Sequence, residues 1–82
     1  MKVDITMEDL EKIYDEVERR VQIDVNDGCF DDIKQVQEYR NALMQGVYSA
    51  LRILSNDWVK TVMMIGKIED DAYWKRLGYP ED

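Results

Sequence analysis

The sequence predicts an all-α protein, a small helical bundle of two long antiparallel helices, a third apolar helix and a short C-terminal helix. Three observations support this prediction. The 82 residues include one proline and four glycines, so few positions interrupt a helix. Residues with high helix propensity, chiefly Glu, Lys, Leu, Met and Arg, occur throughout the chain. Apolar residues recur at spacings of three and four along two long segments. At this length we expect one domain, residues 1–82.

The first helix is expected from about Met7 to about Asp24. Thr6 and Asp9 have the spacing of a helix start, where a hydroxyl and a carboxylate bind free backbone N–H groups. The apolar residues of one face then follow in order: Leu10, Ile13, Tyr14, Val17 and Val21. An Asn-Asp-Gly sequence at 26–28 predicts a turn after this helix.

The second helix is expected from Asp32 to Leu54, where the helical periodicity is strongest. At 1.5 Å per residue such a helix is about 35 Å long. A compact globule formed by a chain of this length is about 30 Å across. We therefore expect the second helix to extend beyond its own domain, which favours self-association.

Two shorter helices are expected to complete the bundle. One begins at Trp58, and its apolar residues cover more than one face, which predicts packing on both sides. The other opens with three acids at 69–71 and ends before Gly78. Ahead of the first helix, residues 3–5 leave open a short extended pairing with the alternating residues 21–25.

The chain is acidic, with 18 acidic and 11 basic side chains and a net charge of −7. Residues 1–32 hold 11 acids and 4 bases, whereas residues 33–68 hold 2 acids and 5 bases. An acidic chain is poorly suited to nonspecific binding of nucleic acid or of anionic membranes, so we expect neither as a direct partner. No apolar run is long enough for a signal-peptide core or a membrane span, and we expect a cytoplasmic protein.

Few catalytic arrangements are compatible with the composition. The chain has no histidine and one cysteine, which excludes Cys/His zinc sites, disulfide frameworks and triads with an imidazole base. Cys29 has only acidic charged neighbours, which disfavour a reactive thiolate, and we expect a half-buried structural residue. We therefore expect no enzyme, no metal and no cofactor.

Three partial motifs fail on spacing or composition. Residues 24–28 are similar to the start of an EF-hand loop, but the glycine falls at the fifth position, where that loop needs an oxygen ligand. Glu8 and Glu11 resemble half of the carboxylate row of magnesium-dependent helical nucleotide hydrolases, but the second helix offers only Glu38. Residues 47–67 have the outline of a helix-turn-helix, but the second helix of that unit is mostly apolar where base-reading side chains are needed.

Four acids line one side of the first helix. Their steps of three and four residues are expected to place them on one exposed face. The row consists of Glu8, Glu11, Asp15 and Glu18. Like charges at this spacing repel at a cost of about 0.2–0.5 kcal/mol per pair. The row is therefore a solvated face, a surface paired with the basic middle segment, or a docking surface for a basic partner.

Small residues repeat along the second helix. Ala42, Gly46 and Ala50 recur every four residues, and a helical glycine costs about 1 kcal/mol relative to alanine. That cost is usually tolerated where another backbone must approach closely. The neighbouring helix is either the third helix or the same helix of a second subunit, and in the second case these residues are our candidate oligomer interface.

Arg40 lies within the apolar stripe of the second helix. A buried guanidinium needs an anionic partner or an exit to water. An acid of the first helix or of a partner subunit is one candidate. The other is a bound anion, held by Arg40 together with Arg52 and Lys60.

From these features we expect a non-enzymatic interaction protein. Its expected role is that of a small acidic inhibitor or adaptor, which binds a basic partner such as a nucleic-acid-handling protein. Small acidic accessory proteins of phages and mobile elements have this profile, which is an argument by analogy. We also expect a homo-oligomer, most simply a homodimer. The alternative function is binding of a small anionic ligand, such as a nucleotide, at a helix or subunit interface.

Overall fold

The computed structural model describes residues 2–79, which fold into four helices joined by short connections. The helices are α1 (Met7–Asn26), α2 (Ile33–Leu54), α3 (Trp58–Ile68) and α4 (Asp71–Arg76). Within residues 2–79 there is no β-strand, so the predicted all-α bundle is confirmed.

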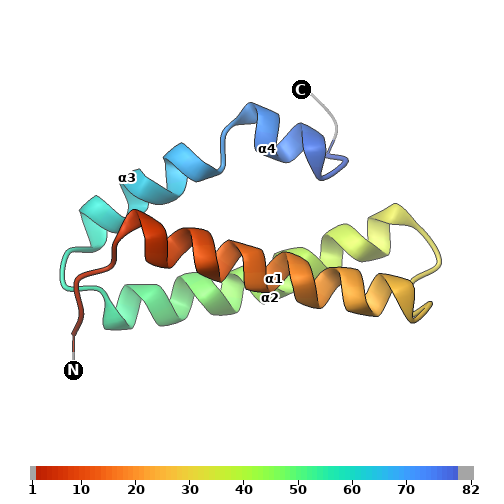
Figure 1. Ribbon diagram of the computed structural model, residues 1–82, viewed down its shortest axis with the longest axis horizontal. Coiled ribbons are helices and arrows are strands. Elements are labelled where there is room, and N and C mark those ends of the chain that lie inside the picture. Colours follow the sequence, from red (N-terminus) through yellow and green to blue (C-terminus); the bar gives the residue numbers. More distant parts are fainter. Residues whose placement is uncertain (1, 80–82) are drawn as a thin grey trace.

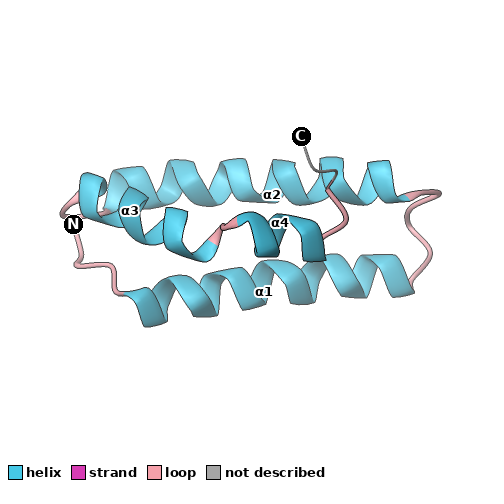
Figure 2. Cartoon of the chain, turned by 90° about the horizontal axis from the view of Figure 1, so that it is seen from above, coloured by secondary structure: helices cyan, strands magenta, loops and turns pink. Residues whose placement is uncertain are grey.

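The helices form two layers (Figures 1 and 2). α1 and α2 lie side by side with opposite chain directions, and α3 followed by α4 covers one face of this pair. The described residues extend over 39 × 28 × 18 Å. α2, with 22 residues, is about 33 Å long and fits within the longest dimension. The expectation that this helix extends beyond its own domain is wrong, because the bundle is elongated rather than spherical.

Each helix begins at a side chain that binds its free backbone N–H groups. At α1, the Thr6 hydroxyl accepts from the Asp9 N–H (3.1 Å), and the Asp9 carboxylate accepts from the Thr6 N–H (3.0 Å). A single aspartate has this role at each of the other helices: Asp32 for α2, Asp57 for α3 and Asp70 for α4. Such caps contribute about 1 kcal/mol each, and they account for the agreement between the predicted and observed helix starts.

The segment before α1 pairs with the connection between α2 and α3. The Val3 N–H donates to Leu54 O (2.7 Å), and Val3 O accepts from the Asn56 N–H (2.8 Å). These bonds form an isolated parallel bridge between Val3 and Ser55. The alternative pairing of residues 3–5 with residues 21–25 is wrong, because the latter remain helical as part of α1.

Side chains of α1, α2 and α4, with Leu77 directly after α4, form the core. Tyr14 and Tyr73 meet edge to face with ring centroids 5.7 Å apart. The turn after α4 is held to α2 by a hydrogen bond from Gln37 Nε2 to Gly78 O (2.8 Å). Gly78 has φ +87°, a left-handed conformation that favours glycine at a helix end. The buried apolar residues are Leu10, Tyr14, Val17, Val21, Met44, Leu51, Tyr73 and Leu77.

α3 packs through one face only. Among its residues Thr61 alone is buried, whereas Val59, Met63 and Val62 are 71%, 64% and 44% exposed. The expectation that α3 is packed on both sides is wrong. Because the bundle has two layers, nothing within residues 2–79 covers the side of α3 that faces away from α1 and α2.

Candidate functional site

The outer side of α1 carries three of the four predicted partner-binding acids. Glu8, Glu11 and Asp15 are exposed, because the buried apolar side chains of α1 lie on its other face, which contacts α2 and α3. We call these three residues the acidic α1 face. Glu8 forms an ion pair with Lys12 (3.2 Å) one turn along the helix. Within residues 2–79, neither Glu11 nor Asp15 has an ion-pair or hydrogen-bond partner.

Glu18, the fourth acid of the row, is turned toward α2 and pairs with Arg40. Arg40 Nε lies 2.5 Å from Glu18 Oε1, and Arg40 Nη2 lies 3.3 Å from Glu18 Oε2. The Arg40 side chain is 5% exposed and that of Glu18 is 28% exposed. The expectation that Glu18 shares the exposed face is wrong, because a buried guanidinium needs a carboxylate partner. The pairing of Arg40 with an acid of the first helix is confirmed.

The ion pair does not satisfy every polar atom around it. Arg40 Nη1 and Tyr14 Oη are buried and have no hydrogen-bond partner within residues 2–79. A buried polar atom without a partner costs about 1–3 kcal/mol. Arg40 is thus enclosed in the core of the bundle, away from the surface where an anion would arrive.

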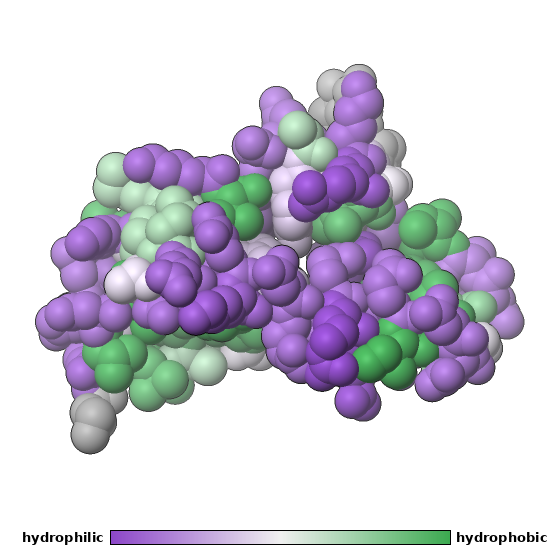
Figure 3. Space-filling model, in the orientation of Figure 1, coloured by the Kyte–Doolittle hydropathy of each residue, from purple (hydrophilic) through white to green (hydrophobic). Residues whose placement is uncertain are grey.

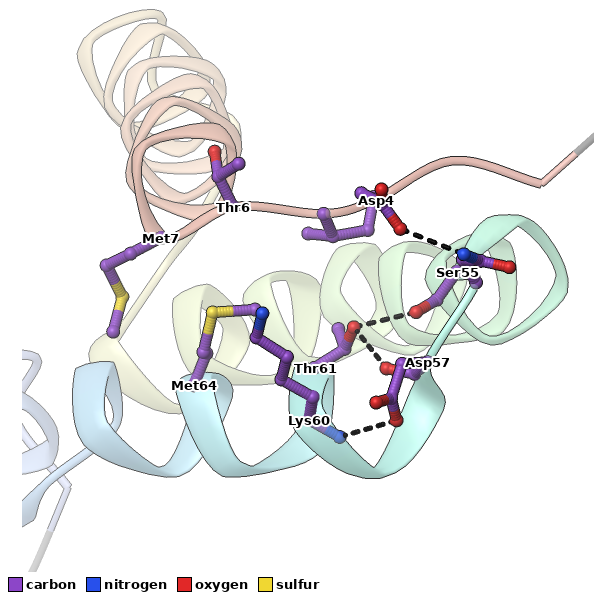
Figure 4. Close-up of a pocket in the computed structure, with 10 residues that line it drawn as sticks. Asp4, Thr6, Met7, Ser55, Asp57, Lys60, Thr61 and Met64 are labelled. Atoms are coloured by element: carbon purple, nitrogen blue, oxygen red, sulfur yellow. Dashed lines mark hydrogen bonds between the residues drawn. The ribbon is translucent and has the colours of Figure 1, made fainter.

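Lys60 lines a pocket between the segment before α1, the α2–α3 connection and α3 (Figure 4). The pocket has a volume of about 480 Å³. Figure 4 shows the Lys60 side chain extending toward Met64, across the pocket from Thr6 and Met7. Arg40 and Arg52 do not line this pocket, so it brings together only one of the three predicted anion-binding cations.

Two buried hydroxyl groups lie at the wall of this pocket. The Thr61 hydroxyl donates to Asp57 O (2.9 Å), so the Ser55 hydroxyl must donate to Thr61 Oγ1 (2.7 Å). Ser55 Oγ therefore keeps only acceptor capacity. The Lys60 ammonium group has no ion-pair partner within residues 2–79 and is the cation among the residues that line this pocket.

The predicted oligomer interface lies on the surface of α2. Ala42, Gly46 and Ala50 are all exposed. A Cβ atom added at Gly46 would meet no atom within 4 Å. Packing among the described residues therefore does not require glycine at this position.

Sequence reasoning missed a carboxyl group at the junction of α3 and α4. Glu69 follows the last residue of α3, and its carboxylate accepts a hydrogen bond from the Tyr48 hydroxyl on α2. Burial raises the pKa of the Glu69 carboxyl to about 7. Burial also raises the pKa of the neighbouring Tyr73 to about 12, with smaller contributions from Glu18 and Glu69. The sequence signal for a buried carboxyl group here is the position of Glu69 directly after the apolar third helix.

Cys29 is exposed in the turn before α2, so the expectation of a half-buried residue is wrong. The preceding Gly28 has φ +76°, and this turn carries the cysteine outward instead of against the core. Among residues 2–79, no three His, Cys, Asp or Glu side chains are grouped in a way that could hold a metal ion. In the same part of the chain, no helix combines the length and apolar character that a membrane crossing requires.

No protein-family model, curated protein or solved structure matches the chain.

Proposed function

We propose that the protein is a non-enzymatic interaction module that binds a basic protein through the acidic α1 face, Glu8, Glu11 and Asp15. One observation carries this proposal. Glu11 and Asp15 are exposed one turn apart on a long helix and have no cation partner within residues 2–79. Like charges at this spacing repel, and a cation of a partner relieves the repulsion.

The position of these acids suits electrostatic recognition of a basic surface. Exposed charges speed encounter and select against wrong partners more than they raise affinity. At about 0.1 M salt the screening length is about 10 Å, so binding should weaken as salt increases. By covering a cationic surface, the protein would act as an inhibitor or adaptor of, for example, a nucleic-acid-handling protein. We further propose, by analogy of size and charge alone, that it is an accessory protein of a phage or mobile element.

Pull-down from a lysate of the source cells tests this proposal. We expect a basic protein to be recovered at low salt and lost as salt rises, and the double variant Glu11→Gln, Asp15→Asn to recover less of it. The matched control Asp31→Asn, Glu38→Gln removes the same charge from exposed positions outside α1 and should behave as wild type. Equal recovery by the two double variants would contradict the proposal.

We also propose that the protein forms a homodimer through Ala42, Gly46 and Ala50 on the outer side of α2. The open space beside Gly46 supports this, because it lets the backbone of a second helix approach closely. Sedimentation equilibrium at tens of micromolar protein should detect a dimer. A single species of 9.8 kDa under these conditions would contradict the proposal.

The Lys60 pocket supports a second candidate function, binding of a small anionic ligand such as a nucleotide. Lys60 contributes an unpaired cation, and the N-termini of α1 and α3, which border the pocket, add favourable dipoles. Asp4 and Asp57 also line it and oppose an anion. A ligand-dependent rise in melting temperature that Lys60→Ala abolishes would support this function. No rise with nucleotides in wild type would contradict it.

A further inference from the structure

The outward side of α3 forms an apolar surface that the fold leaves uncovered. Val59, Val62, Met63 and Gly66 are spaced by three and four residues, so they share one side of the helix. All four are exposed, Val59 and Met63 by 71% and 64%. Figure 3 shows apolar side chains gathered over the region of α3, with hydrophilic ones beside them. We call these four residues the α3 outer face.

Gly66 leaves room for a second helix at this face. It lies inside α3, where glycine costs about 1 kcal/mol relative to alanine. A Cβ atom at this position would meet nothing within 4 Å, so no contact within residues 2–79 requires the glycine. A missing side chain in the middle of an apolar face lets the backbone of a second helix come close.

The charge beside this face indicates what kind of helix it fits. Lys60 and Lys67 are seven residues apart, so both side chains leave α3 on the same flank of the α3 outer face, and the exposed Lys60 side chain then extends toward Met64 at the pocket (Figure 4). Neither lysine has an ion-pair partner within residues 2–79. The carboxylates of Asp57 and Asp70, at the two ends of α3, accept from backbone N–H groups as helix caps.

A second copy of the chain fits this face poorly. In an antiparallel pair of α3 helices the same flanks meet, so Lys60 of one copy would lie near Lys67 of the other and the lysines would repel. Glutamate or aspartate at the flank of a different helix would instead pair with both lysines. The charge pattern therefore favours an acidic partner over self-pairing.

We infer that the α3 outer face docks an amphipathic helix of an acidic partner protein, whose apolar side covers Val59, Val62 and Met63 and whose acids meet Lys60 and Lys67. This surface is separate from the acidic α1 face and has the opposite charge. Together with the acidic α1 face, whose role rests on the proposed function, this surface would give the protein the two docking surfaces that an adaptor requires.

Binding of two synthetic peptides tests the inference. Both form amphipathic helices of about five turns with the same leucine face; one carries Glu on both flanks and the other carries Lys. Affinity for the α3 outer face is measured from the Met63 methyl signal, so that binding of the Lys peptide at the acidic α1 face is not counted. At about 0.1 M salt, where charges more than about 10 Å apart are screened, wild type should bind the Glu peptide at this face several-fold more tightly than the Lys peptide. The Met63 methyl NMR signal should shift during the titration, and that of buried Met44 should not.

Substitutions test whether the Glu peptide binds at the α3 outer face and whether the two lysines select it. Met63→Glu should abolish binding of the Glu peptide, whereas Ile23→Glu, at another exposed apolar position, should leave it unchanged. Lys60→Gln with Lys67→Gln should make the two peptides bind equally. Since Met63 and Ile23 are exposed, circular dichroism should report folded variants. Glu11→Gln with Asp15→Asn should still bind the Glu peptide, so this result is independent of the function proposed for α1.

Three results would overturn the inference. The first is equal affinity of wild type for the two peptides, or no shift at Met63. The second is a dimer in sedimentation that Met63→Glu converts to a monomer, which would assign this face to a second copy of the chain. The third is binding of wild type, but not Met63→Glu, to vesicles of anionic lipid, which would assign it to a membrane surface.

Discussion

Glu18 on α1 and Arg40 on α2 form a two-pronged ion pair, in which Arg40 Nε lies 2.5 Å from Glu18 Oε1 and Nη2 lies 3.3 Å from Oε2. The pair joins the two long helices across 22 residues of sequence. The four acids predicted to share one face of α1 therefore have different surroundings. Glu18 pairs with the buried Arg40, whereas Glu11 and Asp15 are exposed and have no partner in residues 2–79.

Removing the guanidinium should destabilise the protein strongly. Arg40→Ala leaves Glu18 partly buried without a cation, which should lower the free energy of unfolding by about 3 kcal/mol. Arg40→Met should cost less, because the methionine fills the space and removes the unpaired Nη1. Chemical denaturation of both variants measures the difference. If both unfold at the wild-type denaturant concentration, the ion pair does not contribute to stability.

Two acids of the same row should respond differently to neutralisation. Glu18→Gln weakens the ion pair and should lower the free energy of unfolding by about 1–3 kcal/mol. Asp15→Asn removes only repulsion, so stability should stay within about 0.5 kcal/mol of wild type or rise. Thermal melts followed by circular dichroism provide the comparison. A large loss with Asp15→Asn would show that this carboxylate has a structural partner.

The helices could be predicted from sequence because their signals are local. Thr6 and Asp9 lie three residues apart, and the caps Asp57 and Asp70 each bind an N–H three residues ahead. The pairing of Val3 with Ser55 could not be predicted in this way. This pairing depends on how α1 and α2 pack together and bring Ser55 back beside Val3. The spacing of neighbouring residues in the sequence does not specify that packing.

In the candidate sites too, contacts between residues far apart in the sequence could not be predicted. The spacing of the acidic row places Glu11 and Asp15 correctly on the surface, but Glu18 lies near the edge of that face. Whether an edge residue turns inward depends on the buried Arg40 of another helix. Likewise, an apolar composition could not reveal that α3 lies in an outer layer, so it predicted burial where Met63 is exposed.

Two substitutions at Gly46 should separate folding from association. Gly46→Ala should raise the stability of the monomer by about 0.5–1 kcal/mol, since the added methyl meets no atom within 4 Å and alanine favours helix. Gly46→Leu should weaken self-association by holding the second helix away. Denaturation and sedimentation equilibrium measure the two effects. Unchanged association of the leucine variant would exclude Gly46 from the interface.

Glu69 should make stability depend on pH near neutrality. Its carboxyl pKa is raised from 4.5 to about 7, so between these values the folded state keeps a proton that the unfolded state has lost. The free energy of unfolding should therefore decrease as pH rises from about 4.5 to about 7. The carboxyl pKa values of Asp9 and Glu16 are lowered, so these groups make stability depend on pH only below about 4.5.

Glu69→Gln should remove this dependence, because the amide stays neutral at every pH in the window. Tyr48→Phe should shift the dependence to higher pH, because the ionised carboxylate loses its hydrogen-bond donor. Denaturation curves across the window for the three proteins provide the test. A wild-type stability that is flat or increases over this range would contradict the assignment to Glu69.

Calorimetric titration with the purified basic partner tests the role of the acidic α1 face most directly. At about 0.05 M salt, the variant Glu11→Gln, Asp15→Asn should bind about tenfold more weakly than wild type, and the difference should shrink at about 0.5 M salt. The charge-matched control Asp31→Asn, Glu38→Gln should bind as wild type does. Equal dissociation constants for wild type and the α1 variant at low salt would contradict the proposal that this face binds the partner.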